Sequence, residues 1–308
     1  MKQEGSAPLA GSKSILIGKH NTLIIALLLT LVGFSVNSGQ ASEKLPKLIS
    51  TSVCTDQFVL MLAAPEQIAG LSVHATNPDI SPLADRAKQF PSVGDSVEEI
   101  MATGGDLVVL ETWSNHRKSS FLKRMGFQIV NLETARSYED IKGVTRRFAA
   151  TIGRSDAAQN LVARMERAET QARKAHTAQK PEAVYFLPTG SAPGRDTFVH
   201  DLLTLAGFEN YAARQGISGW QHINLETLLR EPPDVFVLSF TDRFSRSART
   251  GFARHPKYQQ LLTTYPNITI KSSDWICAGP FVTRALQTLV QGRLEKSLTL
   301  SSERSAEP

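Results

Sequence analysis

The sequence predicts an α/β protein of two Rossmann-like lobes, each with a parallel sheet, joined by a single long bridging helix. Three observations lead to this expectation. Apolar strand segments alternate with helical segments in both halves of the chain, an almost unbroken run of helix formers separates the halves, and SVEEIMATGGDLVVL (96–110) is matched by NLETLLREPPDVFVL (224–238). Alternation of strands and helices at this spacing favours parallel pairing, with helices covering both faces of the sheet.

The composition is that of an ordinary globular protein. The chain has 308 residues, of which 41% are hydrophobic and 20% charged, and its length favours about two domains. The formal net charge is +5, but the basic residues are spread along helical faces between Glu and Ala. No aromatic-plus-basic platform is present, so the pattern indicates solvated helix faces and no nucleic-acid partner.

The N-terminal region has the order of a secretory signal. Lys13 and Lys19 precede the apolar run 22–36, and the small polar segment 37–41 follows it. We expect residues 1–41 to be a signal peptide cleaved after Ala41, which makes the mature protein periplasmic. A membrane anchor is the alternative, but an apolar run of about 15 residues is shorter than the ~20 that a spanning helix needs.

The first lobe is expected at residues 45–136. Its alternation of apolar and helical periods predicts strands at 47–52, 67–72, 106–111 and 127–131 and helices at 56–63, 97–103 and 117–125. The bridging helix is expected at 137–180. Ser137 and Asp140 form a capping-box-like start, and the segment 153–156 predicts a break after which a second helical stretch begins. A helical connection is stiff, so we expect small movements between the lobes.

The second lobe is expected at residues 181–294. The same periods predict strands at 182–187, 234–239 and 267–271 and helices at 197–206, 225–230, 252–263 and 283–294. Residues 295–308 are rich in Ser, Glu and Lys and show no apolar period, so we expect a disordered tail.

The loops that follow the strands concentrate the chemically varied side chains. Two of the three tryptophans, both cysteines and a group of Ser, Thr and Asp lie in these loops. Because ligands of open α/β sheets bind beyond the carboxyl ends of the strands, this pattern predicts a site for a bulky, ring-bearing ligand. The alternatives are loop capping for the polar residues and core packing for the tryptophans. The candidate ligand-binding residues are Cys54, Thr55, Trp113, Thr189, Arg195, Asp196, Asp274, Trp275 and Cys277.

Common catalytic signatures are not found in the sequence. There is no HExxH, no paired-cysteine zinc spacing and no GxSxG elbow, and the segment 190–197 lacks the glycine spacing and the Lys of a phosphate loop. One hypothesis for the function is nevertheless an enzyme of the cell envelope that acts on metallated tetrapyrroles, as a chelatase does. Its candidate residues are Cys54, His74, His116 and Cys277.

Four stretches together carry a family resemblance: ISTSVCTDQFVLMLAAPEQIAGLS, FPSVGDSVEEIMATGGDLVVL, NLETLLREPPDVFVL and SSDWICAGPFVTRAL. In order and spacing they resemble the periplasmic substrate-binding proteins of ABC importers for iron chelates and vitamin B12. The resemblance implies a monomer without enzymatic activity or a cofactor. It implies capture of a ferric siderophore or cobalamin between the lobes and delivery to a membrane permease and its ATPase.

In that family a glutamate on each lobe docks into the permease, and the matching positions here are Glu98 and Glu226, with Glu99 as an adjacent candidate. The alternative is that these carboxylates only stabilise the first turns of their helices through the helix dipole.

Cys54 and Cys277 leave three possibilities open: a bridge across the cleft, contact with the ligand, or two buried thiols. A bridge would tie the lobes together and restrict their opening.

Overall fold

The computed structural model describes residues 45–112, 116–187, 189–239 and 254–304, with the backbone alone for 296–304. All of these residues belong to one compact unit. The signal peptide expected at 1–41 therefore lies outside the described residues. Among the described helices, none is long and apolar enough to cross a membrane.

The first lobe is built on a five-stranded parallel sheet with the strand order β3-β2-β1-β4-β5. Its strands are β1 (Leu48–Ser50), β2 (Ile68–Ser72), β3 (Ser92–Val93), β4 (Leu107–Glu111) and β5 (Gln128–Leu132). Its helices are α1 (Val53–Leu62), the 3-10 turn η1 (Pro65–Gln67), α2 (Ala84–Ala87), α3 (Val97–Ala102) and α4 (His116–Arg124). All four expected strands are present. The short elements β3 and α2 were not predicted, because two to four residues show no period.

The second lobe contains a four-stranded parallel sheet with the order β11-β10-β6-β8. Its strands are β6 (Glu182–Tyr185), β8 (Glu209–Asn210), β10 (Val235–Leu238) and β11 (Asn267–Thr269). Its helices are α7 (Phe198–Leu205), α8 (Tyr211–Arg214), α9 (Leu225–Arg230), α10 (Pro256–Thr264), the 3-10 turn η3 (Ser272–Asp274) and α11 (Val282–Arg304). A separate antiparallel pair, β7 (Ser191–Pro193) and β9 (Trp220–His222), was not predicted.

The strand orders define where a ligand is expected. Strand order reverses direction between β1 and β4 in the first sheet and between β6 and β10 in the second. In open parallel sheets the crevice beyond the carboxyl ends of the strands at such a reversal is the usual ligand site. Each lobe therefore has one such edge.

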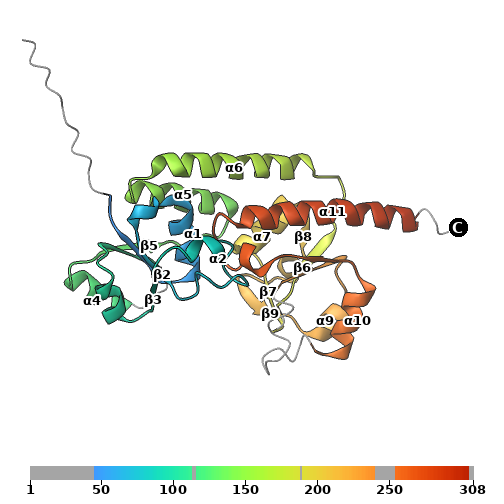
Figure 1. Cartoon of the computed structure of the whole chain (residues 1–308). Helices are drawn as coiled ribbons and strands as arrows, with labels where there is room; N and C mark the ends of the chain where they lie inside the picture. Colours follow the sequence, from blue (N-terminus) through green and yellow to red (C-terminus); the bar gives the residue numbers. More distant parts are fainter. Residues whose placement is uncertain (1–44, 113–115, 188, 240–253, 305–308) are drawn as a thin grey trace, which may run out of the picture. The chain divides into compact units, whose positions relative to one another are not determined.

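Two helices make up the expected bridging region, α5 (Tyr138–Thr151) and α6 (Ser155–Lys174). The predicted capping box is confirmed: Asp140 N–H donates to Ser137 Oγ at 3.0 Å, and Ser137 N–H donates to Asp140 Oδ2 at 3.1 Å. The predicted break is also present, since Gly153 has a φ of 71°, a left-handed conformation that glycine adopts at little cost. The long helix α6 runs along both lobes and packs on α5 and α11 (Figure 1).

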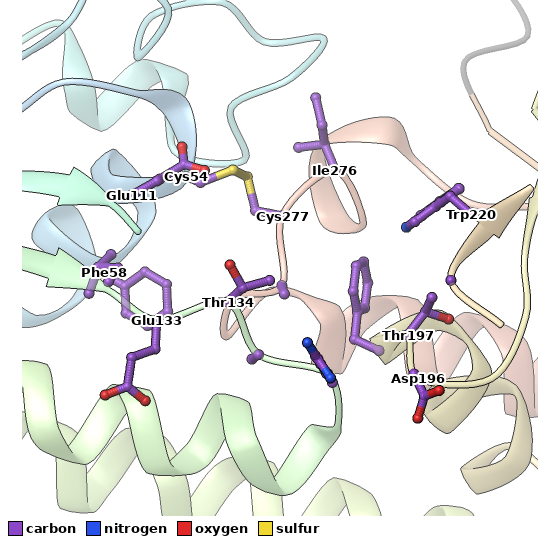
Figure 2. A pocket seen from close by; sticks show the side chains of 16 residues that line it. Cys54, Phe58, Glu111, Glu133, Thr134, Asp196, Thr197, Trp220, Ile276 and Cys277 are labelled. Carbon is purple, nitrogen blue, oxygen red and sulfur yellow. A yellow bond between two sulfur atoms is a disulfide. The ribbon is translucent and has the colours of Figure 1, made fainter. Parts of the chain in front are cut away.

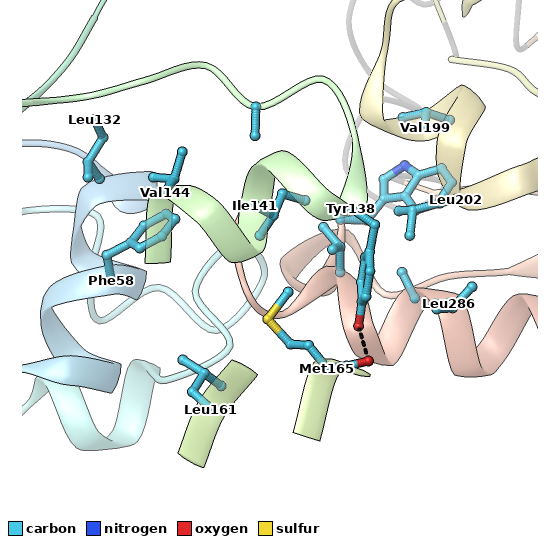
Figure 3. Close-up of a cluster of buried hydrophobic side chains, with 14 of the residues drawn as sticks. Phe58, Leu132, Tyr138, Ile141, Val144, Leu161, Met165, Val199, Leu202 and Leu286 are labelled. Carbon is cyan, nitrogen blue, oxygen red and sulfur yellow. Dashed lines mark hydrogen bonds between the residues drawn. The ribbon is translucent and has the colours of Figure 1, made fainter. Parts of the chain in front are cut away.

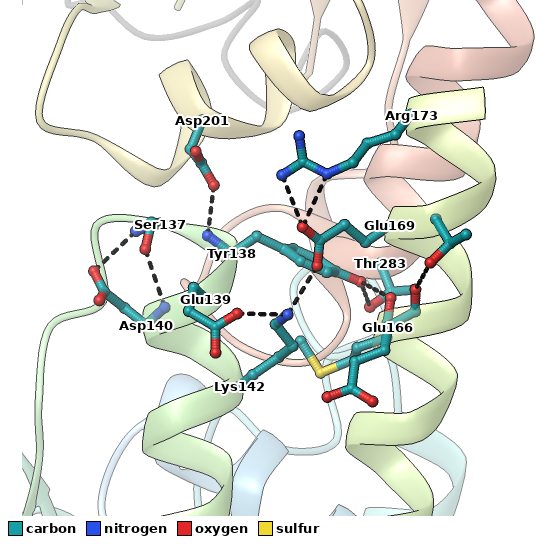
Figure 4. A network of polar contacts seen from close by, with 12 residues as sticks. Ser137, Tyr138, Glu139, Asp140, Lys142, Glu166, Glu169, Arg173, Asp201 and Thr283 are labelled. Carbon is teal, nitrogen blue, oxygen red and sulfur yellow. Dashed lines mark hydrogen bonds and ion pairs between the residues drawn. The ribbon is translucent and has the colours of Figure 1, made fainter. Parts of the chain in front are cut away.

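Polar contacts fasten α5 to both α6 and the second lobe (Figure 4). The buried Lys142 ammonium pairs with Glu139 at 2.6 Å and with Glu169 of α6 at 2.8 Å. Tyr138 N–H donates to Asp201 Oδ2 of α7 at 2.6 Å. The Tyr138 hydroxyl lies 2.9 Å from Thr283 Oγ1 of α11. The connection between the lobes is thus a packed layer rather than a free linker.

The largest hydrophobic core is continuous through both lobes. Phe58 of the first lobe packs near Val144 of α5, whose apolar face continues through Tyr138 toward Leu202 and Leu286 of the second lobe (Figure 3). Because protein interiors resist deformation once they are close-packed, this shared core agrees with the expectation of small movements between the lobes.

The doubled sequence unit forms the same structure twice. Asp106 precedes β4, and its Oδ2 accepts the N–H of Lys47 at the start of β1, the strand that pairs with β4, at 3.1 Å. Asp234 precedes β10, and its Oδ2 accepts the N–H of Glu182 at the start of the paired β6 at 2.7 Å. The two lobes therefore share one helix–strand unit, as the sequence repeat indicates.

The expected disordered tail is wrong for residues 295–304, where α11 continues to Arg304. Residues 295–304 include Glu, Lys and Leu, which favour helix, and extending an existing helix avoids the cost of nucleation. Residues 305–308 lie outside the described part.

Candidate functional site

A pocket of about 440 Å³ lies between the two lobes, beyond the carboxyl ends of β4 and β5 (Figure 2). This volume falls within the range of about 300–1,000 Å³ that is usual for small-molecule sites. The first lobe contributes Cys54, Phe58, Glu111 and residues 132–136, and the second lobe contributes residues 196–198, 219–220 and 276–278. The pocket thus includes the β1/β4 reversal of the first sheet.

A disulfide between Cys54 and Cys277 crosses from one lobe to the other at the edge of this pocket (Figure 2). The two Cα atoms are 5.4 Å apart, although 223 positions separate the residues in the sequence. Of the three possibilities that the sequence left open, the bridge is present, and both cysteines also line the pocket. The alternative of two buried thiols is therefore wrong.

The first turn of α1 aims Cys54 across the cleft. Ser52 Oγ caps the helix by accepting the Thr55 N–H at 3.2 Å. The Thr55 side chain is fully buried and lies 2.7 Å from Ser50 Oγ. Thr55 does not line the pocket, so its predicted contact with a ligand is corrected to a capping role that orients its neighbour Cys54.

Trp275 belongs to the core and does not line the pocket. Its side chain is 2% exposed, and its ring packs edge-on against Tyr185 with 4.6 Å between centroids. It also contacts Phe198, at 6.3 Å between centroids, and Phe198 does line the pocket. The 3-10 turn η3 directs Trp275 inward, whereas the next residue, Ile276, reaches the pocket. The predicted ligand contact of Trp275 is corrected to support of the pocket wall.

Trp220 lies on the pocket wall, and sequence reasoning missed it. It is 48% exposed and stands at the start of β9, directly after Gly219, whose φ is 69°. It belongs to the antiparallel β7–β9 pair, and its ring centroid lies 6.2 Å from that of Tyr185. A lone Trp next to a turn glycine, in GISGWQH, was the available signal.

The polar candidates of the second lobe divide into one pocket residue and three others. Asp196 lines the pocket with a left-handed φ of 61°, and its Oδ2 accepts the Ser218 hydroxyl at 2.7 Å. Arg195 donates to the Ala213 carbonyl at 3.0 Å, and Thr189 is exposed, but neither lines the pocket. The buried Asp274 lies 3.5 Å from Arg284 Nη1 and also stays out of the pocket lining. Burial raises its pKa, which Arg284 partly offsets.

Trp113 was predicted as a ligand contact and lies outside the described residues.

The chelatase hypothesis loses two of its candidate ligands, because Cys54 and Cys277 are bonded to each other and are not thiolates. His74 and His116 are exposed. Within the described ranges, no group of three or more His, Cys, Asp or Glu is placed to hold a metal ion.

Behind the pocket wall, α1 carries a carboxyl group that has no exposure to solvent. Asp56 accepts the Ser72 N–H at 3.0 Å and the Ser72 hydroxyl at 2.6 Å. Burial raises its pKa to about 6, against the lowering effect of the serine hydrogen bonds and of His74. Between the ordinary Asp pKa of 3.8 and about 6, the unfolded chain ionises while the folded protein keeps the proton, so stability falls as pH rises through that window.

We predict that Asp56→Asn raises the free energy of unfolding at pH 7.5 by about 1–2 kcal/mol and by much less at pH 4. The amide removes the buried charge, and it can still accept the Ser72 N–H and donate to the Ser72 hydroxyl. Urea unfolding of both proteins at the two pH values checks this. The same change at the exposed Asp85, whose pKa is lowered by Lys88, should not raise stability at pH 7.5. An Asp56→Asn variant that is less stable than the wild type at pH 7.5 would contradict the assignment.

Glu98 and Glu226 stand in the first turns of α3 and α9, at matching places in the two lobes. Both are exposed, and neither has a hydrogen bond or an ion pair within the described residues. The adjacent Glu99 is different, since its carboxylate accepts the Ser96 hydroxyl at 2.7 Å as part of the α3 cap. Asn224 stands at the N-cap position of α9, but its side chain makes no capping hydrogen bond.

Two parallel-sheet lobes, a packed helical connection and a pocket at the ends of the strands define a two-lobed ligand-binding protein. A family model described as periplasmic binding protein matches residues 48–267. This chain therefore belongs to the periplasmic binding protein family, which confirms the resemblance seen in the sequence. A comparison with curated proteins gives no match.

Several solved structures share the fold. The periplasmic heme-binding protein of Roseiflexus sp. RS-1, in apo form, is 19% identical, with 80% of this chain and 98% of that chain covered and a TM-score of 0.64. The periplasmic vitamin B12 binding protein of Vibrio cholerae is 15% identical, with 80% and 96% covered and a TM-score of 0.58. An ABC-type Fe3+-hydroxamate transport system from Saccharomonospora viridis is 17% identical, with 80% and 93% covered and a TM-score of 0.61. At these identities the likeness shows the fold alone.

Proposed function

We propose that this protein captures a metal chelate, a ferric siderophore or cobalamin, between its lobes and delivers it to the permease of an ABC importer. The observation that carries the proposal is the interlobe pocket, whose wall combines apolar side chains with the exposed indole of Trp220. In this proposal residues 1–41 export the chain to the periplasm, the mature protein is a monomer, and the ATPase drives release through the permease.

The chemistry of the wall supports a ligand whose metal is already fully coordinated. Among the described lining residues there is no His, Tyr or Met, and both cysteines are held in the disulfide. Among these residues, carboxylates are the only side chains that ordinarily bind iron or cobalt. We therefore expect a chelator to supply the coordination sphere of the metal. An apolar wall with few polar groups suits the body of such a chelate.

Glu98 and Glu226 are the proposed docking residues for the two permease subunits. Their exposure, their lack of partners within the described residues and their matched positions on α3 and α9 support this role. The helix dipole explains the placement of each carboxylate singly, but it does not require both lobes to carry one.

Titration of the purified protein tests the proposal. We expect cobalamin or one member of a ferric siderophore panel to quench tryptophan fluorescence saturably, because Trp220 lies on the pocket wall. Trp220→Phe should reduce the amplitude of the quenching, because it removes the indole on the pocket wall. Absence of saturable quenching with every chelate would count against the proposed function.

A further inference from the structure

The charged side chains on the pocket wall are not equally free to meet a ligand. The wall contains three carboxylates, Glu111, Glu133 and Asp196, and one guanidinium, Arg136. Glu111 accepts a hydrogen bond from the Ser52 hydroxyl, Glu133 pairs with Arg147 at 2.6 Å, and Asp196 accepts the Ser218 hydroxyl at 2.7 Å.

Arg136, by contrast, has no hydrogen bond or ion pair from its side chain to any other residue that the structure describes. Its own backbone N–H is the group that is bonded, to Asp140 Oδ2 at 3.0 Å. The guanidinium is therefore the uncommitted charge of the described pocket wall.

The backbone that carries Arg136 is held firmly on both sides. Ala135 before it is buried, and Ser137 after it donates its N–H to the same Asp140 oxygen at 3.1 Å. One residue further on, the Tyr138 N–H is bonded to Asp201 of the second lobe. Because Asp140 Oδ2 is occupied by two backbone donors, it fixes the loop and is not paired with the guanidinium. A cation on such a fixed loop is presented to the pocket at little cost in backbone ordering.

We propose that Arg136 is a specificity-determining residue that binds an anionic group, a carboxylate by preference, at the periphery of the chelate. A guanidinium meets a carboxylate with two parallel N–H···O bonds, which a lysine cannot reproduce. The apolar wall, which includes Phe58, Phe198 and Trp220, takes the body of the ligand. The inference rests on the proposed function and narrows its substrate class to chelates that carry a free acidic substituent beside an apolar or ring-bearing body.

Two matched pairs of probes test this assignment. One pair is cyanocobalamin and its monocarboxylic acid, in which one side-chain amide is replaced by a carboxylate. The other is ferrioxamine with its terminal amine either acetylated or succinylated, so that only the second carries a carboxylate. Dissociation constants are measured for the wild type, Arg136→Ala, Arg136→Lys and, as a control, Arg164→Ala on the exposed face of α6.

For whichever of the two chelates binds, cobalamin or ferrioxamine, we expect the wild type and Arg164→Ala to favour the acidic probe over its neutral partner. The expected ratio of dissociation constants is about tenfold to a hundredfold, as for a charge-assisted hydrogen-bonded pair. Arg136→Ala should bring the ratio close to one without changing the affinity for the neutral partner, and Arg136→Lys should fall between. Binding with a ratio that Arg136→Ala leaves unchanged would overturn the role of Arg136 and leave the proposed function standing. No binding of the four probes, together with no binding of any member of the ferric siderophore panel, would contradict the proposed function itself, and the inference with it.

Discussion

Replacement of both Cys54 and Cys277 by serine is expected to lower the free energy of unfolding by about 3–5 kcal/mol. The disulfide joins residues 223 positions apart, so it restricts most of the chain in the unfolded state. An argument from chain entropy gives about 5 kcal/mol for a loop of this length, and measured values for native disulfides are commonly about 2–5 kcal/mol. The loss should be seen as a lower midpoint in urea unfolding.

The wild type under reducing conditions is the control, because reduction breaks the disulfide without replacing either cysteine. Its stability should equal that of the double serine variant. We also expect both forms to unfold less cooperatively, because α1 of the first lobe and the 276–278 segment of the second are then held together by packing alone. A double variant as stable as the oxidised wild type would show that the disulfide constrains neither the folded nor the unfolded state.

Reversal of both proposed docking charges, Glu98→Lys with Glu226→Lys, is expected to reduce uptake of the chelate by at least about a hundredfold and to leave its dissociation constant unchanged. Both carboxylates are exposed, outside the pocket lining, and unpaired within the described residues. The family resemblance implies basic docking pockets on the permease, so each lysine would face a like charge across the interface, which costs several kcal/mol. A residue remote from the ligand pocket has little influence on ligand affinity. Uptake is measured in cells that lack the native protein and carry the variant, and the dissociation constant is measured by fluorescence titration.

A control with the same change in net charge separates docking from general electrostatics. Glu66→Lys with Glu209→Lys also reverses one exposed glutamate in each lobe, in positions that do not match between the lobes. This pair should retain most of the uptake. If the Glu98 and Glu226 pair transports normally, the two glutamates are helix-terminal charges and nothing more.

The fold could be predicted from sequence because its signals are local and repeated. Buried parallel strands such as β4 and β10 appear as apolar runs, and the Asp that directly precedes the strand of each repeat marks the equivalent unit in both lobes. The Ser137 capping box and the break at Gly153 are likewise set by neighbouring residues. The prediction failed where no local period exists, at the short strands β3 and β8 and at the antiparallel pair of β7 and β9.

The site was predicted less well, because whether a residue lines the pocket depends on the direction in which its side chain points. The expected loops do meet at the pocket, and Cys54, Asp196 and Cys277 line it. Trp275 and Thr55 are each adjacent in the sequence to a residue that lines the pocket, but their own side chains are buried, and no spacing rule predicts this difference. Trp220 reaches the wall from β9, which was not predicted, and Arg136 reaches it from the loop between β5 and α5, which shows no ligand-binding motif. Their positions depend on tertiary packing of β9 and of the α5 cap.

The most direct test of the account fills the pocket. Ala278 is a small residue on the pocket wall, so Ala278→Trp should occupy the space that the chelate needs. Isothermal titration with the chelate that binds the wild type compares this variant with Ala102→Trp, which adds the same side chain on the exposed end of α3. We expect one binding site per chain in the wild type and in Ala102→Trp, and at least a hundredfold weaker binding in a folded Ala278→Trp. Undiminished binding by a folded Ala278→Trp protein would contradict the claim that the interlobe pocket holds the ligand.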